Sequence, residues 1–186
     1  MTELEIHDWP LSYAAQLRER DTTDVDLVVI HCTELPDLAT ARAYGERALH
    51  PDGGGNSGHW YIDHDGAIHR FVPGTHIAHH TRGYNERSLG IELVNTGRFP
   101  DWFDSRKQTM TEPYPNAQID ALLGLLRAIR NDYPRLCYIA AHEDLDTGMV
   151  PASDDASRQV HRKRDPGPLF PWLRVLRECG LQRLMP

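Results

Sequence analysis

The chain has 186 residues, of which 40% are hydrophobic and 25% charged, a composition that suits a single globular domain with its own core. Its formal net charge of −7 argues against a nucleic-acid-binding protein, because neutralising phosphates requires clustered Lys and Arg. No stretch approaches the roughly 18 apolar residues that a membrane span needs, so no membrane segment is expected.

The N-terminus and the cysteines predict a cytoplasmic protein. The first residues have no basic start followed by an apolar run, so no secretory signal is expected. Cys32, Cys137 and Cys179 form an odd set without CxxC spacing, which is typical of reduced thiols rather than of a disulfide framework.

Hydrophobic patterns predict alternating strands and helices. Residues 26–31 (DLVVIH) and 136–142 (LCYIAAH) are compact apolar runs typical of buried strands. An Asp-Gly turn at 64–66 predicts a hairpin between strands at 59–63 and 67–72. The remaining predicted elements are a strand at 88–94, an amphipathic helix that ends before Pro134 with Asn116 as its N-cap, and helices at 38–49 and 169–179.

The other segments are predicted to be irregular. They are a polar lead-in with a short helical stretch, a glycine-rich loop at 51–58, an excursion at 96–115 and a polar loop that ends at Pro168. We therefore expect an α/β (α+β) fold with a central mixed sheet flanked by helices. The predicted organisation is a lead-in at 1–25 followed by one domain at 26–178.

Two of the eleven histidines occupy the same structural context. His31 ends the strand DLVVIH, and His142 ends the strand YIAAH. Ligands gather where loops leave a sheet, so both imidazoles point into one pocket if these strands are neighbours. Alternatively, each is only a hydrogen-bonded histidine near the end of the sheet.

A third candidate ligand is Asp165, which directly precedes a proline. The residue before proline is held in an extended conformation, so the Asp165 side chain has a fixed orientation. Two neutral imidazoles and one carboxylate are the ligand set of an open catalytic zinc site, whose fourth position holds water. The sequence thus predicts one Zn²⁺ per chain on His31, His142 and Asp165. An Asp-Pro turn without any chemistry is the alternative.

Hydrolysis at such a site also needs a proton acceptor. Zinc lowers the pKa of its water to about 7 and polarises a carbonyl. Glu92 interrupts the apolar strand SLGIELV, so it is either exposed to solvent or placed in a pocket as a general base. Lys163 is either a solvated charge in the run Arg-Lys-Arg or a group that stabilises a developing oxyanion.

These residues together resemble the type 2 N-acetylmuramoyl-L-alanine amidase family, which includes AmpD-type enzymes, phage amidases and peptidoglycan recognition proteins. The resemblance spans about residues 26–175, and its last piece is similar to the AmpD-type branch. The matching pieces are VVIHCT at 28–33, SGHWYIDHDG at 57–66, HHTRGYNERSLGIEL at 79–93, AAHEDL at 140–145 and KRDPGPLFPW at 163–172.

The resemblance implies zinc on His31, His142 and Asp165, a catalytic Glu92 and an oxyanion-stabilising Lys163. By analogy His80 lines the substrate cleft, and His59 matches a recurrent family histidine; a structural role is the alternative for both. Phage members carry Cys as the third ligand and Tyr before the His of the HWY piece. Asp165 and Gly58 stand at those positions here, which fits the glutamate-based branch.

The resemblance implies a zinc-dependent amidase that hydrolyses the bond between N-acetylmuramic acid and L-alanine in muropeptides or peptidoglycan. The expected substrate is a soluble, recycled fragment, including the 1,6-anhydro form, and the expected state is a monomer. A phage-derived or otherwise exported lysin would equally lack a signal. One alternative is a recognition module that binds peptidoglycan without cutting it. Another is a zinc protease or deacetylase, but this sequence has no HExxH motif to support it.

Overall fold

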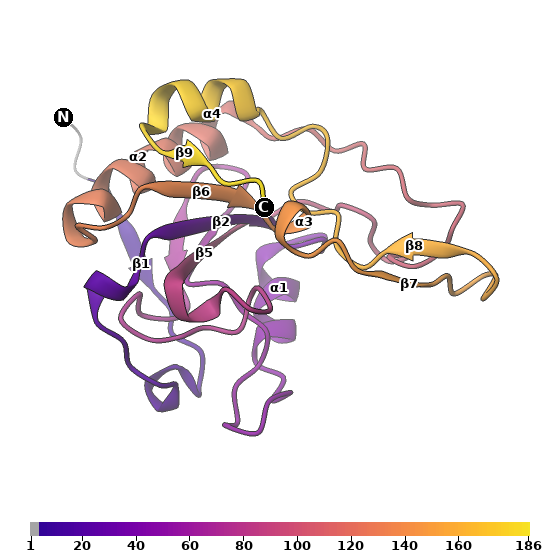
Figure 1. Ribbon diagram of the computed structural model, residues 1–186, viewed down its shortest axis with the longest axis horizontal. Coiled ribbons are helices and arrows are strands. Elements are labelled where there is room, and N and C mark those ends of the chain that lie inside the picture. Colours follow the sequence, from indigo (N-terminus) through magenta and orange to yellow (C-terminus); the bar gives the residue numbers. More distant parts are fainter. Residues whose placement is uncertain (1–3) are drawn as a thin grey trace.

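The computed structural model describes residues 4–186 and has one seven-stranded mixed sheet with helices on both faces (Figure 1). The strand order is β1-β4-β3-β5-β2-β6-β9, and neighbouring strands are parallel except in the β3–β4 hairpin. The strands are β1 (Ile6–Asp8), β2 (Leu27–Cys32), β3 (Trp60–Ile62), β4 (Ile68–Arg70), β5 (Ser88–Leu93), β6 (Tyr138–Ala141) and β9 (Gln182–Arg183). This architecture confirms the predicted fold class.

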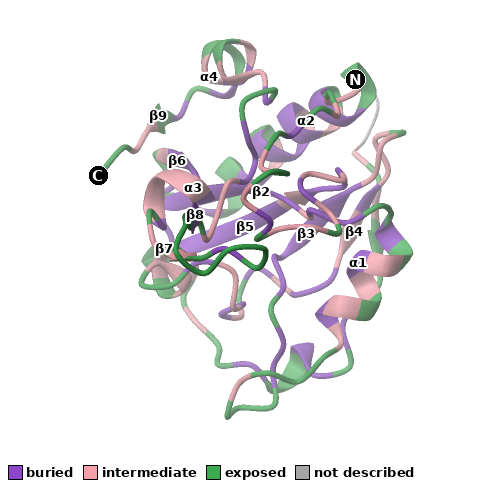
Figure 2. Ribbon diagram, turned by 90° about the vertical axis from the view of Figure 1, so that its right-hand side faces the viewer, coloured by how far each residue is buried: buried purple, intermediate pink, exposed green. Residues whose placement is uncertain are grey.

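One face of the sheet is covered by α2 (Asn116–Asp132) and α4 (Trp172–Cys179) (Figure 1). Alternate residues of the central strands pack against the apolar side of α2 in the largest hydrophobic core, and Figure 2 shows the buried residues concentrated there. Strand β2 is buried throughout its length, which explains its continuous apolar run. The opposite face carries α1 (Leu38–Gly45) and the candidate site.

The chain outside 26–178 contributes more than the sequence predicted. Strand β1 pairs with β4 at one edge of the sheet, and β9 pairs with β6 at the other. Leu11, Tyr13 and Leu17 are buried in a second core with α1. The predicted helical stretch of the lead-in is two short 3₁₀ turns at Ala14–Gln16 and Thr22–Asp24. Strands of two or three residues have no periodicity to detect, so only tertiary pairing reveals them.

Several boundaries also differ. Helix α1 ends at Gly45 rather than at residue 49, and α4 begins at Trp172 rather than at 169. Asn116 is the first helical residue of α2 and not its N-cap; its side chain instead accepts a hydrogen bond from Arg174. The predicted polar loop contains α3 (His142–Leu145) and a hairpin of β7 (Met149–Pro151) and β8 (Gln159–His161). Among residues 4–186 no helix has the length and apolar character needed to cross a bilayer.

Candidate active site

Strand alternation directs His31 and Glu92 to the same side of the sheet. The two residues are register partners on the parallel strands β2 and β5. Their neighbours Ile30 and Ile91 pack in the core with α2. Because successive side chains of a strand point to opposite faces, His31 and Glu92 both project away from that core.

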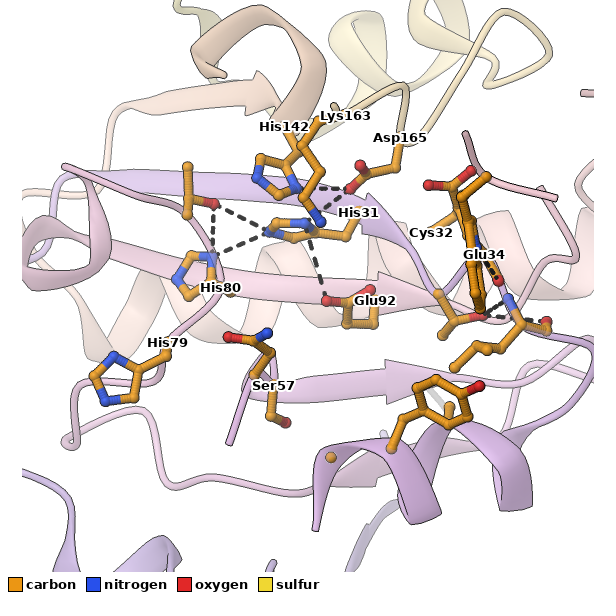
Figure 3. A pocket seen from close by; sticks show the side chains of 18 of the residues that line it. His31, Cys32, Glu34, Ser57, His79, His80, Glu92, His142, Lys163 and Asp165 are labelled. Carbon is orange, nitrogen blue, oxygen red and sulfur yellow. Dashed lines mark hydrogen bonds and ion pairs between the residues drawn. The ribbon is translucent and has the colours of Figure 1, made fainter. Parts of the chain in front are cut away.

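His31, His142 and Asp165 converge at the carboxyl ends of β2 and β6 (Figure 3). Nδ1 of His31 lies 3.0 Å, and Nδ1 of His142 2.9 Å, from Oδ2 of Asp165. One donor atom from each residue lies within 4.8 Å of the others, and all three side chains are buried. The structure thus brings together the three ligands that the sequence predicts.

The spacing of these donor atoms fits a zinc ion. Zinc–ligand bonds of about 2.0–2.2 Å place tetrahedral ligands roughly 3.3 Å apart, close to the 3.0 and 2.9 Å that separate the two imidazole nitrogens from Oδ2 of Asp165. Oδ1 of Asp165 is buried and has no hydrogen-bond partner within residues 4–186. A buried carboxylate oxygen without a partner is costly, whereas an ion at this position would satisfy it.

The protonation states suit metal binding. Burial, reinforced by the neighbouring His142, lowers the pKa of His31 to about 4, so its imidazole is neutral. Burial alone would raise the pKa of Asp165, but His142, His31 and Lys163 outweigh burial and hold it well below its ordinary value. Metal ligands must be a neutral imidazole or an ionised carboxylate, which are the states of His31 and Asp165.

The Asp165 turn is fixed by contacts from two distant segments. The backbone N–H of Glu143, next to His142, donates to the carbonyl of Asp165 at 3.0 Å. The Tyr114 hydroxyl donates to the carbonyl of Pro166 at 2.7 Å. Tyr114 belongs to the predicted irregular excursion, which therefore helps to position a candidate ligand.

Glu92 lies beside this cluster in a largely buried position. Its Oε1 is 3.9 Å from Nδ1 of His31, and its side chain is 13% exposed. Burial, followed by the negative charge of Asp165, raises the pKa of Glu92 to about 8, and Lys163 opposes the rise. A β-carbon added at Gly58 would lie 2.9 Å from Cγ of Glu92, so only glycine leaves room for this carboxylate.

Lys163 points into the same site beside His31 (Figure 3). Its positive charge lowers the pKa values of Glu92, His31 and Asp165. An ammonium in this position can donate hydrogen bonds to an anionic oxygen that forms next to the trio.

His80 contacts the far side of His31. Nδ1 of His80 lies 3.0 Å from Nε2 of His31, and Nε2 of His80 lies 3.3 Å from the Ser88 hydroxyl. The Ser88 hydroxyl in turn donates to the carbonyl of Tyr84 at 2.7 Å. If Nδ1 of His31 binds a metal ion, the ring proton is on Nε2, which then donates to Nδ1 of His80, and the chain fixes the orientation of the ring. The family resemblance implied only that His80 lines the substrate cleft.

Replacing His80 by phenylalanine is expected to weaken zinc binding by about 10–100-fold, because Nε2–H of His31 loses its closer acceptor and keeps only the Thr81 hydroxyl at 3.4 Å. His79→Phe is a matched control, since Nε2 of His79 pairs with Asp52 at 2.7 Å rather than with the cluster. Competition with a metal-binding dye measures both affinities. Equal affinity of His80→Phe and the parent protein would contradict this role.

His59 has contacts that favour a structural role. It is fully buried, and it does not line the cavity formed by the other site residues. Its Nδ1 accepts a hydrogen bond from the N–H of Gly90 at 2.9 Å, and its Nε2 lies 3.0 Å from the carbonyl of His76. Burial and the charge of Arg20 hold the pKa of His59 well below its usual value, so it ties β5 to a loop as a neutral ring.

Cys32 follows His31, and among the described residues its thiol does not belong to the group of donor atoms close enough together to hold a metal ion. Burial, followed by the charge of Asp165, raises the pKa of its thiol well above the ordinary value, so it stays protonated. Only the thiolate binds zinc. We expect Cys32→Ala to retain full zinc content and to lose about 1–2 kcal/mol of unfolding free energy through packing. Metal analysis and denaturant unfolding measure both; loss of zinc would show that Cys32 is a ligand.

A buried ion pair beside the site has no counterpart in the sequence expectations. Arg98 donates two hydrogen bonds of 2.7 Å to the carboxylate of Glu34, and its side chain is 1% exposed. The same guanidinium donates to the carbonyl of His161 at 2.9 Å. Arg98 therefore ties the excursion at 96–115 to the end of β8, two residues before Lys163. No periodicity or motif marks it in the sequence.

The candidate site lies in one cavity of about 370 Å³. The three candidate ligands meet Glu92, Lys163 and His80 in its wall. The remaining lining includes three aromatic residues and two basic residues. The aromatic residues are Tyr44, Trp102 and Phe103, and the basic residues are Arg82 and Arg162. The cavity therefore combines a candidate metal site, a buried carboxylate and contact surfaces for a larger ligand.

Sequence comparison finds relatives among amidases. Residues 21–168 match the N-acetylmuramoyl-L-alanine amidase family. The chain is also 34% identical over 119 residues to N-acetylmuramoyl-L-alanine amidase AmiD of Escherichia coli, an alignment that covers 60% of this chain and 37% of AmiD. The chain thus spans well under half the length of that relative.

Solved amidase structures have the same fold. The amidase LysC from Clostridium intestinale superposes with a TM-score of 0.66 at 21% identity, over 95% of this chain and 98% of LysC. The complex of AmiD from E. coli with anhydro-N-acetylmuramic acid-L-Ala-D-γ-Glu-L-Lys superposes with a TM-score of 0.61 at 25% identity, over 86% of this chain and 58% of that structure. With the family match over residues 21–168, this chain belongs to the N-acetylmuramoyl-L-alanine amidase family.

Proposed function

We propose that the protein is a zinc-dependent amidase that hydrolyses the bond between N-acetylmuramic acid and L-alanine in peptidoglycan fragments. The observation that carries the proposal is the convergence of His31, His142 and Asp165 with Glu92 and Lys163 in one cavity. Family membership and the AmiD complex with an anhydro-muropeptide support this substrate class. The 1,6-anhydro form, one zinc per chain, the monomeric state and the cytoplasmic location stay predictions.

Each residue has a distinct role in this proposal. His31, His142 and Asp165 would hold the zinc ion, which supplies Lewis acidity and lowers the pKa of a water molecule. Glu92 accepts the proton of the attacking water and returns it to the departing L-alanine nitrogen. Lys163 donates a hydrogen bond to the oxygen of the scissile carbonyl as negative charge develops on it.

The raised pKa of Glu92 suits this exchange of protons. Without a cation its pKa is about 8, because burial and Asp165 disfavour the charged form. Positive charge at the His31–His142–Asp165 site moves the pKa down toward neutrality, since an opposite charge favours the carboxylate. A base with a pKa near the working pH can both take and return a proton.

A recognition module that binds peptidoglycan without cutting it remains the rival function. The complete ligand set together with Glu92 and Lys163 argues against it, because binding alone needs neither a buried proton acceptor nor an oxyanion donor.

One digestion separates the two functions. The protein is incubated with anhydro-N-acetylmuramoyl-peptide and, separately, with intact sacculi, with and without a zinc chelator, and the products are identified by mass. We expect free peptides that begin with L-alanine, and no such release after chelation. Binding of the muropeptide without release of peptide would support the recognition module instead.

A further inference from the structure

Two arginines share one aspartate at the edge of the cavity. Nε and Nη2 of Arg82 each lie 3.4 Å from an oxygen of Asp146. Arg162 contacts the same carboxylate more closely, with Nε at 3.3 Å and an ion pair between Nη2 and Oδ2. Asp146 is 5% exposed, whereas the Arg82 side chain is 71% exposed. Both arginines line the cavity.

Direct contacts join two guanidinium groups to a single carboxylate. Lys163 follows Arg162 directly in the chain. Burial, followed by the like charge of Arg82, lowers the pKa of Arg162, and the negative charge of Asp165 opposes this shift. The contacts of Arg82 are long for a charged pair, so its guanidinium retains the capacity to bind a second carboxylate in bidentate fashion.

The aspartate that holds the arginine pair is joined to a candidate metal ligand by one short helix. His142 is the first residue of α3, and Asp146 is its C-cap, with an N–H that donates to the carbonyl of His142 at 2.9 Å. A rise of 1.5 Å per residue separates these two positions by about 6 Å along the helix. Arg82 follows His80, the partner of His31, by two residues.

We infer that Arg82 and Arg162 bind the free α-carboxylate of the D-glutamate in the stem peptide, an inference that rests on the proposed function. The substrate in the AmiD complex contains L-Ala-D-γ-Glu, and a γ-linkage leaves the α-carboxylate of that glutamate unbonded. Since adjacent Cα atoms are about 3.8 Å apart, this carboxylate lies roughly 7 Å from the scissile carbonyl in an extended chain. That reach is of the same order as the roughly 6 Å of helical rise between the backbone positions of His142 and Asp146, the partner of both arginines.

Kinetics with two matched substrates test this subsite. The substrates are anhydro-N-acetylmuramoyl-L-Ala-D-γ-Glu-L-Lys and the same molecule with the D-glutamate α-carboxylate converted to an amide. We expect the parent protein to favour the carboxylate form by about tenfold in kcat/KM, the value of one charge-assisted hydrogen bond. Arg82→Gln should lose this preference, because its kcat/KM should fall more for the carboxylate form than for the amide form. Arg158→Gln, which changes an exposed arginine of the β7–β8 hairpin outside the cavity, should keep it.

Binding to a cleavage-deficient protein separates this inference from the proposed function. The dissociation constants of both substrates are measured on Glu92→Gln, with and without Arg82→Gln. A preference for the carboxylate form that disappears with Arg82→Gln supports the subsite, even if the parent protein cleaves neither substrate. The inference is overturned if Arg82→Gln weakens both substrates equally, if the preference persists without Arg82, or if neither substrate binds at millimolar concentration.

Discussion

Glu92→Gln is expected to lower kcat by about 10²–10⁴-fold while zinc content and KM change little. Glutamine keeps the size and hydrogen bonding of the side chain but cannot accept a proton, and general-base assistance has this magnitude. Glu92 lies 3.9 Å from His31 and is not one of the three proposed ligands, so the metal should stay bound. Steady-state kinetics on an anhydro-muropeptide, together with metal analysis, measure both quantities.

Glu143→Gln is the matched control for this substitution. Burial, followed by Asp165, raises the pKa of Glu143 to about 7, so it is a second carboxyl group with a raised pKa next to a candidate ligand. Glu143 does not line the cavity, and its carboxylate accepts a hydrogen bond from Gly167, which glutamine can also do. Turnover should therefore fall only for Glu92→Gln.

Lys163→Ala separates the proton acceptor from the oxyanion donor. Loss of one donor to the developing oxyanion should lower kcat by about 10²–10³-fold. The acidic limb of the kcat/KM profile should survive in Lys163→Ala, where Glu92 is intact, and should be displaced or flattened in Glu92→Gln. Near-normal turnover of Glu92→Gln would identify another group as the base. Loss of zinc from both variants would show that they support the metal site rather than the chemistry.

Asp165→Asn is expected to abolish turnover at limiting zinc. It should also lower zinc affinity by more than the roughly 10–100-fold that follows loss of a group hydrogen-bonded to a metal ligand, because Asp165 is itself a proposed ligand. The amide preserves the shape of the side chain but removes the negative charge toward which both Nδ1 atoms converge. Zinc titration of the metal-free variant measures the affinity, and circular dichroism checks the fold.

Asp104→Asn is the control for a general effect of removing a buried aspartate. Asp104 is 7% exposed and pairs with Arg106 outside the cavity. It should bind zinc like the parent protein. An Asp165→Asn variant that retains tight zinc binding would remove Asp165 from the ligand set and leave only two histidines as ligands.

The central strands, helix α2 and the cluster of His31, His142 and Asp165 could be predicted from the sequence, because the local sequence patterns agree with the tertiary structure there. Strands β2, β5 and β6 and helix α2 have apolar patterns that are long enough to show their periodicity. Alternation within SLGIELV placed Leu89, Ile91 and Leu93 on one face, which left Glu92 on the other, and the register pairs it with His31.

The parts that could not be predicted depend on contacts between distant residues. The edge strands β1 and β9 are too short to show a period, and Arg98 reaches Glu34 across 64 positions of sequence. The contact of His80 with His31 likewise depends on tertiary structure, because it joins the loop before β5 to the end of β2. None of these pairings leaves a local pattern.

Gly58 shows how packing limits the position beside the candidate base. A β-carbon there would approach Cγ of Glu92 to 2.9 Å and the carbonyl oxygen of Gly90 to 3.1 Å. A larger residue at position 58 would therefore have to displace Glu92.

Zinc titration of the metal-free protein tests the central claim most directly. Activity is followed as release of L-alanine-headed peptide from anhydro-N-acetylmuramoyl-L-Ala-D-γ-Glu-L-Lys, with each product identified by mass. If His31, His142 and Asp165 form one zinc site, release rises from zero with added zinc and levels off at one equivalent per chain. Release that is already maximal without metal, or no release at any zinc concentration, would contradict the account of a zinc-dependent amidase.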